Sequence, residues 1–451
     1  MLFFGGGMFE LRLKTIFRKL CQWRLVVLIC ITGGNVSAQE VQTLYTLSGC
    51  TNGCEVSQFL LTSDGTIYAS AYSGGISNRG TIFKLTPQKE LSVLVHFTGT
   101  NGIFPKASLI QGQDERLYGT THAGGYHAGA GRGTVFKVAT NGADFTQLHS
   151  FSGSDGRRPA GKLFQDSNGD LFGTTEYGGV HDKGTVFKIT TNGQFTSLLS
   201  FDGTNGATPT GGLLQANDGL LYGTTKYGGT SNRGTFFRMS REGVITTLLS
   251  FPVTKKSYSV VAPEGELVSA PNGTIHGIAY VDDSYQGAAF SVTTNGVITG
   301  LTQFAYQEYA VAPIAFGIDA KPYVMSTGYG FISPARIYKD FQEFVTLPWE
   351  YSGGLYGPIS GLILGSDGAL YGTRYGWFFR LPTAKLPKLS TKADGSLVVN
   401  GSVGGLYGLQ FSTNIATTNW STIETFKLTT PNHIIAETNI QSERFYRAIR
   451  P

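Results

Sequence analysis

Charged side chains are scarce in this chain of 451 residues, since Asp, Glu, Lys and Arg together make up 14% of it, against about 25% in average soluble proteins. Long amphipathic stretches with helical spacing are also missing after residue 40, which excludes a helical repeat protein. The 62 glycines have no triplet period, which excludes collagen, and 12% aromatic residues exclude a disordered chain. The abundance of Gly, Thr, Tyr and Phe instead favours short strands joined by tight turns.

The chain after residue 38 carries no excess of basic residues, although the net charge of the whole chain is +5. Residues 1–38 contain five Lys and Arg against one acid, Glu10, and so account for +4 of that charge. The remainder is nearly neutral and has no basic surface for a phosphate backbone. We therefore expect no nucleic-acid partner.

Apolar runs long enough to span a bilayer, about 20 residues, are absent as well. The apolar run at 25–31 follows a basic stretch at 12–24 and precedes Val36-Ser37-Ala38. This order predicts a secretory signal peptide over residues 1–38, cleaved after Ala38. We expect an exported protein without a membrane span.

Cysteine is rare, with four in the chain. Cys21 and Cys30 lie in the predicted signal peptide, which leaves Cys50 and Cys54 in the mature protein. Two neighbouring cysteines in an exported chain predict one disulfide. A metal-binding pair is the alternative, but it lacks a nearby second pair or His. We expect neither a metal nor another cofactor.

A segment of the type YGTT-x-x-GG recurs along the chain. It is clearest at 118–125, 172–179 and 222–229, and four weaker copies bring the total to seven, spaced by 47–54 residues. A second block, GTVFK in its best form, and a third, L-x-x-F, follow most copies. With the apolar stretch that precedes each copy, one repeat contains four short strands.

The copy that ends at residue 251 predicts strands over 211–216, 220–227, 234–240 and 245–251. Asp-Gly or Asn-Gly between apolar runs is a strong hairpin signal, because both turn residues need a positive φ. A four-stranded antiparallel meander of about 50 residues, repeated in tandem, is the blade of a β-propeller.

The two ends of the repeat region are complementary. Residues 41–49 match the fourth strand of a blade, whereas the seventh copy has three strands over about 359–381 and no fourth. Pairing them predicts a closed seven-bladed propeller over residues 39–384, without open sheet edges. An open solenoid of meanders is the alternative, although it does not need complementary ends.

Residues 385–451 lack the repeat. Five short alternating runs, among them YGLQFSTN and RFYRAI, predict a small C-terminal β-sandwich. The whole mature chain is therefore expected to be all-β.

The pattern YGTT-x-x-GG…GTVFK…L-x-x-F-x-G-x-x-x-G-x-x-P resembles the Gloeo-Verruco (GloVer) tandem repeat of exported bacterial proteins. The clearest copies lie in 94–251, where Pro105, Pro159 and Pro209 follow the Gly turns. The segment LQFSTN…W…RFYR is similar to a C-terminal β-domain common on Verrucomicrobial exported proteins. The resemblance implies a bacterial protein that is secreted, periplasmic or on the outer cell surface. It brings no catalytic residues.

The long loops of each repeat are the YGG…RG loop between the second and third strands and the loop between blades. Both emerge on one face of a propeller, which we name the loop face, and ligands often bind at such loops. Tyrosines there could contact a sugar or peptide, and basic side chains could hold an acidic group. The candidates are Tyr177, Tyr227, His122, Arg132, His181, Lys183 and Arg233. The alternative roles are packing between blades for the tyrosines, and solvated surface or local ion pairs for the basic residues.

Motifs for catalysis are missing: no spacing pairs two carboxylates as glycoside cleavage requires, and no nucleophile elbow occurs. We therefore expect a monomeric, non-catalytic propeller that binds a glycan or surface protein at its loop face. Two alternatives stay open. One is a polysaccharide hydrolase or lyase with its site in the central cleft, and the other is a purely structural component of the cell surface.

Overall fold

The computed structural model describes residues 41–382 with short gaps, and six strands within 388–449. The gaps in the first range are 48–49, 127–131, 256–257, 282–285, 305–307, 311–313, 318–319, 329–335, 341, 347–358 and 375–376. The predicted signal peptide, 1–38, lies outside the described residues. The described residues form strands and loops, and they include no helix that could cross a bilayer.

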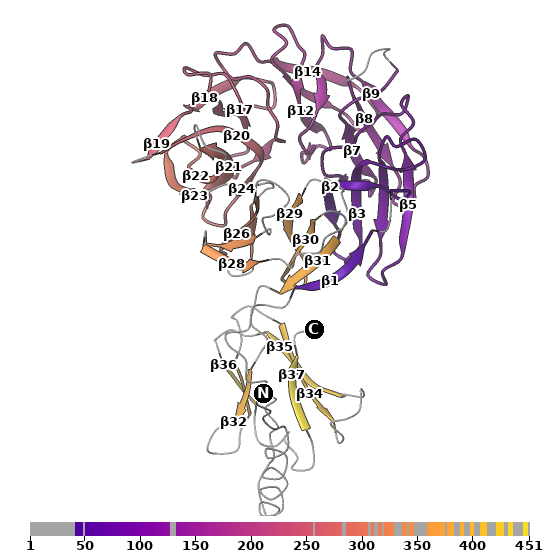
Figure 1. The fold of residues 1–451 in the computed structure, drawn as a ribbon, viewed down its shortest axis with the longest axis vertical. Helices are drawn as coiled ribbons and strands as arrows, with labels where there is room; N and C mark the ends of the chain where they lie inside the picture. The colour runs from indigo at the N-terminus through magenta and orange to yellow at the C-terminus, as the bar shows by residue number, and fades with distance from the viewer. Residues whose placement is uncertain are drawn as a thin grey trace, which may run out of the picture. The chain divides into compact units, whose positions relative to one another are not determined.

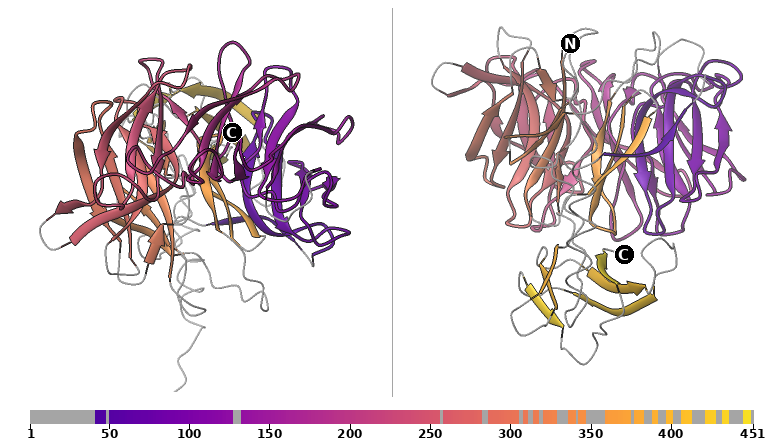
Figure 2. Two further views of the ribbon diagram at one scale, coloured as in Figure 1. Left: turned by 90° about the horizontal axis from the view of Figure 1, so that it is seen from above. Right: turned by 60° about the horizontal axis from the view of Figure 1, so that its bottom comes forward.

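The chain divides into two units, residues 38–383, and residues 1–37 together with 384–451. In the unit 38–383, seven antiparallel sheets are arranged around a common axis (Figures 1 and 2), which is the arrangement of a seven-bladed propeller. We number the sheets as blades 1 to 7 in chain order.

Blades 1 to 4 have nearly the same strands. Blade 1 consists of β2 (Cys54–Leu61), β3 (Ile67–Ser73), β4 (Thr81–Leu85) and β5 (Leu91–His96), and blade 2 of β6 (Ile110–Gln111), β7 (Leu117–Thr121), β8 (Thr134–Val138) and β9 (Thr146–Ser150). Blade 3 consists of β10 (Arg157–Pro159), β11 (Phe164–Gln165), β12 (Leu171–Tyr177), β13 (Thr185–Ile189) and β14 (Phe195–Ser200). Blade 4 consists of β15 (Leu214–Gln215), β16 (Leu221–Thr225), β17 (Thr235–Met239) and β18 (Ile245–Ser250). The strands β15 to β18 lie within the four ranges that the sequence predicts for this copy.

Blades 5 to 7 keep the order although their sequences depart from the repeat. Blade 5 consists of β19 (Val253–Lys255), β20 (Tyr258–Ser269), β21 (Ile275–Val281), β22 (Gly287–Val292) and β23 (Ile298–Gln303). Blade 6 consists of β24 (Glu308–Ala310), β25 (Ala315–Phe316), β26 (Pro322–Gly328), β27 (Arg336–Lys339) and β28 (Gln342–Thr346). Blade 7 consists of β29 (Ile359–Leu364), β30 (Ala369–Arg374) and β31 (Trp377–Pro382) together with β1 (Gln42–Thr46).

The repeated Thr residues form buried pairs inside blades 2 to 4. Thr175 of β12 and Thr185 of β13 are fully buried, and their hydroxyl oxygens lie 2.8 Å apart. Thr175 also donates to the carbonyl of Tyr177, where the long loop begins. The same hydroxyl pair joins Thr225 to Thr235 at 2.8 Å. The second Thr of GTT and the Thr of GTVF therefore hold the end of the second strand against the third.

A glycine and a proline make the contact between consecutive blades. A Cβ on Gly184 of blade 3 would lie 2.7 Å from Cδ of Pro209 in blade 4, so only glycine fits there without a shift. Beside it, Thr208 donates its backbone N–H to the carbonyl of Lys183 at 2.8 Å. The same glycine and proline contact occurs between the other early blades, in the pairs Gly80–Pro105, Gly133–Pro159 and Gly234–Pro263.

The apolar cores lie between neighbouring blades. Phe151 of blade 2 and Phe187 of blade 3 are fully buried in one cluster, with ring centroids 5.3 Å apart. Phe201 of blade 3 and Phe237 of blade 4 repeat this contact at 5.5 Å. Burial of these rings stabilises the interface between blades rather than the single sheet.

The first and last strands of the unit share one sheet. Strand β1 pairs antiparallel with β31, with Gln42 opposite Arg380 and Thr46 opposite Trp377. The predicted pairing of the N-terminal strand with the region 377–381 is therefore present. A disulfide joins Cys50, in the loop that follows β1, to Cys54, the first residue of β2.

The unit that contains residues 384–451 has two three-stranded sheets. One consists of β32 (Lys388–Thr391), β33 (Leu397–Asn400) and β36 (Asn432–Ile435), and the other of β34 (Leu406–Ser412), β35 (Ser421–Lys427) and β37 (Phe445–Ile449). The prediction of five strands was wrong by one, because the short run at β32 has no clear alternation of apolar residues.

Candidate functional site

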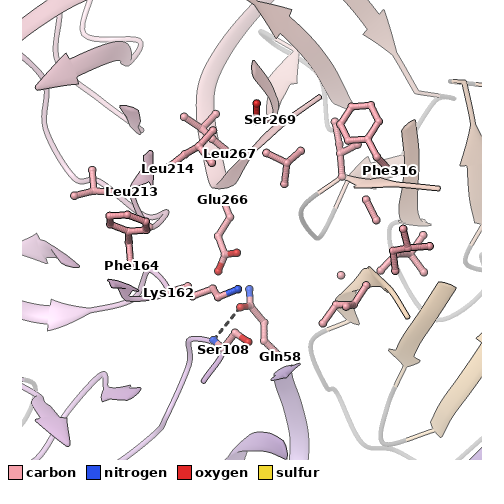
Figure 3. Close-up of a pocket in the computed structure, with 18 of the residues that line it drawn as sticks. Gln58, Ser108, Lys162, Phe164, Leu213, Leu214, Glu266, Leu267, Ser269 and Phe316 are labelled. Carbon is pink, nitrogen blue, oxygen red and sulfur yellow. Dashed lines mark hydrogen bonds between the residues drawn. The ribbon is translucent and has the colours of Figure 1, made fainter. Parts of the chain in front are cut away.

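A cavity of about 570 Å³ lies where the innermost strands of the blades meet. Its lining residues come from the strand that precedes the YGTT-type strand in each of the seven blades, or from the segment leading into it (Figure 3). We call this strand the first strand of its blade; it is β11 in blade 3, β20 in blade 5 and β25 in blade 6. A cavity of this size is in the range that binds small molecules. We name it the central cavity.

Most polar side chains of the cavity lining occupy one register position of the repeat; Gln215 and Ser269 lie three residues further along their strands. This position comes directly before the buried Leu or Phe of the first strand, such as Leu163 in blade 3. The residues there are Gln58, Ser108, Lys162, Gly212, Glu266 and Gly361 in blades 1 to 5 and 7. We name Gln58, Ser108, Lys162 and Glu266 the polar ring. Figure 3 shows the side chains of Glu266, Lys162 and Gln58 pointing toward one another.

Glu266 is the ring residue with unmet hydrogen-bonding capacity. Its Oε1 is buried and has no hydrogen-bond partner. Burial raises the pKa of Glu266, although the charge and the backbone N–H of Lys162 favour the ionised form. A buried acceptor without a donor costs free energy, so a hydrogen bond that a ligand supplied to this carboxyl group would be favourable.

The orientation of the Gln58 amide follows from its partner. The backbone N–H of Ser108 donates to Gln58 Oε1 at 2.9 Å. Since an N–H needs an acceptor, the oxygen is fixed there, and the NH₂ group is turned toward Lys162 (Figure 3). Gln58 and Lys162 therefore both present donors to the cavity.

The rest of the wall is mostly apolar. Phe164, Leu214, Val268 and Phe316 line the cavity, and they follow the ring position along their strands. The first strands run from the loop face toward the short hairpins between the first and second strands. The lining therefore extends from the polar ring toward the hairpins, away from the loop face.

Tyr177 and Tyr227 hold equivalent sequence positions but different environments. The guanidinium carbons of Arg157 and Arg158 lie 4.9 and 5.6 Å from the centroid of the Tyr177 ring. Tyr227 is 44% exposed, with Lys226 Nζ 5.9 Å from its ring centroid. Tyr177 thus has two guanidinium groups close to its ring, whereas Tyr227 has one ammonium group near its ring and remains exposed.

His122 belongs to a charged cluster between blades 2 and 3. Its Nε2 lies 3.4 Å from Glu176 Oε2, and Lys106 Nζ lies 3.0 Å from Glu176 Oε1. Burial opposes ionisation of Glu176, but the hydrogen bond from His122 and the charge of Lys106 outweigh it and lower the pKa to about 2. The cluster therefore ties two blades together with its charges paired.

The remaining candidates lie on the 2–3 loops. Arg132, Lys183 and Arg233 accept backbone hydrogen bonds from the next blade through their carbonyl oxygens, at 2.8, 2.8 and 2.7 Å. Lys183 and Arg233 are exposed, Arg132 is half-buried, and His181 is exposed. None of the seven loop-face candidates lines the central cavity.

The polar ring was missed at the sequence level. Its residues lie in the weakest block of the repeat, where Gln, Ser, Lys, Gly and Glu replace one another before a constant apolar residue. That contrast between a constant neighbour and a changing polar position is the signal that could have found the ring. Reading it requires the register of the first strands, which have few residues in blades 2 and 4.

Two catalytic arrangements are not met in the described part of the chain. The described lining of the cavity contains one carboxylate, Glu266, whereas glycoside hydrolysis uses two. The described residues also contain no group of three or more His, Cys, Asp or Glu that could hold a metal ion.

Comparison with known sequences gives one family. A family model described as the Gloeobacter/Verrucomicrobia repeat matches residues 32–217 and, overlapping these, 128–290. No curated protein sequence matches the chain.

Several solved structures are similar in fold. The extracellular domain of a protein assigned to a hybrid two-component system of B. thetaiotaomicron aligns with a TM-score of 0.51 at 11% identity, over 81% of this chain and 45% of that one. A second such domain from the same organism gives 0.47 at 11% identity, over 89% and 54%. An ulvan lyase of polysaccharide lyase family PL25 gives 0.46 at 11% identity, over 76% and 96%. The chain spans less than half the length of the first structure, and that likeness supports the propeller fold alone.

Proposed function

Since the chain belongs to the Gloeobacter/Verrucomicrobia repeat family, we propose that it is an exported bacterial protein whose propeller binds a ligand, without catalysis, in its central cavity. The family match agrees with the resemblance carried by residues 94–251. Export is favoured by the order of basic, apolar and small residues in 1–38. The location is secreted, periplasmic or at the outer cell surface.

The observation that carries the proposal is a cavity of about 570 Å³ lined from every blade, whose lining residue Glu266 has a buried Oε1 without a hydrogen-bond partner. A protein core normally satisfies such an atom. Here no described residue donates a hydrogen bond to Oε1 of Glu266, and a ligand in the cavity can supply a donor to this carboxyl group. The single carboxylate of the lining favours binding over hydrolysis.

The proposal includes a closed ring of seven blades, a monomeric state and a C-terminal β-sandwich over residues 385–451. Ring closure is supported by the pairing of β1 with β31 and by a cavity lined from every blade. A closed ring gives the cavity a continuous wall, which an open solenoid would not.

A second candidate is binding of a glycan or a surface protein at the loop face. The exposed ring of Tyr227 favours it, since an aromatic face can stack on a sugar or a peptide side chain. This candidate places the ligand at the other end of the first strands from the cavity wall.

Two tryptophan substitutions distinguish the candidates. Ser269 is exposed at the cavity wall, and Ser154 is exposed in a loop of the loop face. We expect Ser269→Trp to fill the cavity, and Ser154→Trp to serve as the matched control with the same side chain outside it. The mature protein and both variants are screened against a fragment library by thermal shift and against a glycan array.

Ligands that stabilise the wild type and Ser154→Trp, but not Ser269→Trp, support the central cavity. Loss of binding in Ser154→Trp alone supports the loop face instead. If every ligand binds all three proteins equally, binding in the central cavity is wrong.

A further inference from the structure

The polar ring contains two opposite charges that do not neutralise each other directly. Lys162 and Glu266 both face the central cavity, and Figure 3 shows the carboxylate directed toward the ammonium group. The ion pairs within 4.0 Å between described residues do not include this pair. A gap therefore separates a group that only donates from a group that only accepts.

The donor side of the gap has a second member. The NH₂ group of Gln58 is held beside Lys162, because Gln58 Oε1 is occupied by the N–H of Ser108. Two neighbouring donors cannot satisfy each other and need an acceptor between them. Across the gap, Glu266 Oε1 needs a donor.

A hydroxyl group meets both needs, since it accepts from Lys162 or Gln58 and donates to Glu266. It also leaves the charges balanced. A carboxylate in the gap would face Glu266, and an ammonium group would face Lys162, so either would add a like charge at short range in a poorly solvated site.

The walls beyond the ring restrict the rest of the ligand. Phe164, Leu214, Val268 and Phe316 offer no hydrogen bonds. The polar lining side chains beyond the ring are Gln215 and Ser269. A sugar unit placed among the apolar ones would leave several of its hydroxyl groups without partners, which costs free energy for each one buried. An apolar body meets no such cost and gains from burial.

We propose that the central cavity takes a small amphiphile with an apolar body and an uncharged hydroxyl head, whose head lies between Lys162, Gln58 and Glu266. The inference rests on the proposed function, because it specifies the ligand of the same cavity. It excludes a glycan as the occupant of the cavity.

A series of probes with one apolar body tests the head group. Binding of 1-octanol, octanoate and octylammonium to the mature protein is measured by isothermal titration calorimetry at pH 7, with glucose as a probe that has hydroxyl groups and no apolar body. We expect 1-octanol to bind at least tenfold more tightly than either charged probe, and glucose not to bind.

Two ring variants must then shift the preference in opposite directions. Glu266→Gln leaves Lys162 as the charge of the ring, so octanoate should gain at least tenfold relative to octylammonium. Lys162→Met leaves Glu266, so octylammonium should gain by a similar factor. A loss of packing alone would weaken all probes together and would not reverse the order of the two charged probes.

The inference is wrong if octanoate or octylammonium binds the wild type as tightly as 1-octanol does. It is also wrong if the two variants change both charged probes in the same direction. If Ser269→Trp abolishes binding of a glycan and the octyl probes do not bind, cavity binding stands while the amphiphile is excluded. If no ligand responds to Ser269→Trp, the proposed function fails with it.

Discussion

Glu266 and Glu176 are two carboxylates with opposite electrostatic environments, and their pH responses should differ in sign. Burial raises the pKa of Glu266 above its ordinary value of 4.5. The folded protein therefore binds this proton more readily than the unfolded chain does. Its stabilising contribution is present below pH 4.5 and is lost as the pH rises through the folded-state pKa.

Glu266→Gln should remove the loss of folding stability that ionisation of this carboxyl group causes as the pH rises. We expect the variant to gain stability relative to the wild type as the pH rises from 4 to 7, because an amide carries no buried charge. Urea unfolding of both proteins across this range measures the difference. A difference that does not change with pH would contradict the assignment of a raised pKa to Glu266.

Glu176→Gln should show the reverse. The pKa of Glu176 is lowered from 4.5 to about 2 by His122 and Lys106 despite its burial. Its contribution to stability is present above pH 4.5 and is lost as the pH falls toward about 2. We expect the variant to be less stable than the wild type by roughly 1–3 kcal/mol at pH 7 and equal to it near pH 2. Equal stability at pH 7 would show that the cluster contributes nothing.

Tyr177 and Tyr227 allow a matched comparison at the loop face. Tyr177→Ala removes a ring that contacts Arg157 and Arg158, so it should lower the unfolding free energy by about 1–2 kcal/mol. Tyr227→Ala removes an exposed ring and should change it by less than about 0.5 kcal/mol. Chemical denaturation measures both. A glycan or protein that binds the loop face should lose affinity with Tyr227→Ala at unchanged stability.

At the scale of the elements, the cost of disturbing the contact between a glycine and the proline of the next blade can be measured. The measurement compares substitution of two glycines that both have a positive φ but differ in their neighbours. Gly184 has φ +98° and faces Pro209, whereas Gly219 has φ +79° and nothing within 4 Å of an added Cβ. Both substitutions to Ala place a side chain in the left-handed region, so that cost is shared. We expect Gly184→Ala to cost about 1–3 kcal/mol more than Gly219→Ala, from overpacking of the added Cβ against the Thr175 carbonyl oxygen and against Pro209. Equal losses in unfolding free energy would show that the glycine and proline do not determine the fit between blades.

The strands could be predicted from the sequence because each copy supplies its own register. The residues of β16 and β17, for example, appear in the repeat as the blocks YGTT and GTFFR, with an Asp-Gly turn before them. The polar ring could not be found in the same way. Lys162 and Glu266 come close together only when the first strands of blades 3 and 5 approach the same axis, and nothing in either copy alone indicates that neighbour. The loop-face candidates were chosen by loop length, which does not locate a cavity.

At the scale of the whole molecule, strands β1 and β31 bring the two ends of the propeller unit into one sheet. Deleting residues 39–48 removes β1 and leaves β31 with an open edge, which invites pairing with other chains. We expect the truncated protein to aggregate or to melt at a much lower temperature than the wild type. Calorimetry and light scattering on the mature protein and the deletion variant measure this. A truncated protein that stays monomeric with unchanged melting would contradict the closed ring.

The pairing of β1 with β31 also determines when the last blade can form during translation. Trp377 of β31 donates its indole N–H to Thr43 of β1 across 334 residues of sequence. At about 5–20 residues per second, β1 leaves the ribosome roughly 15–70 s before its partner strand exists. Blades 1 to 6 can form in order during that interval, because their strands are close in sequence. The last blade cannot, so a chain that stalls or terminates before β31 is complete carries an unpaired first strand, and such incomplete translation products should be prone to association.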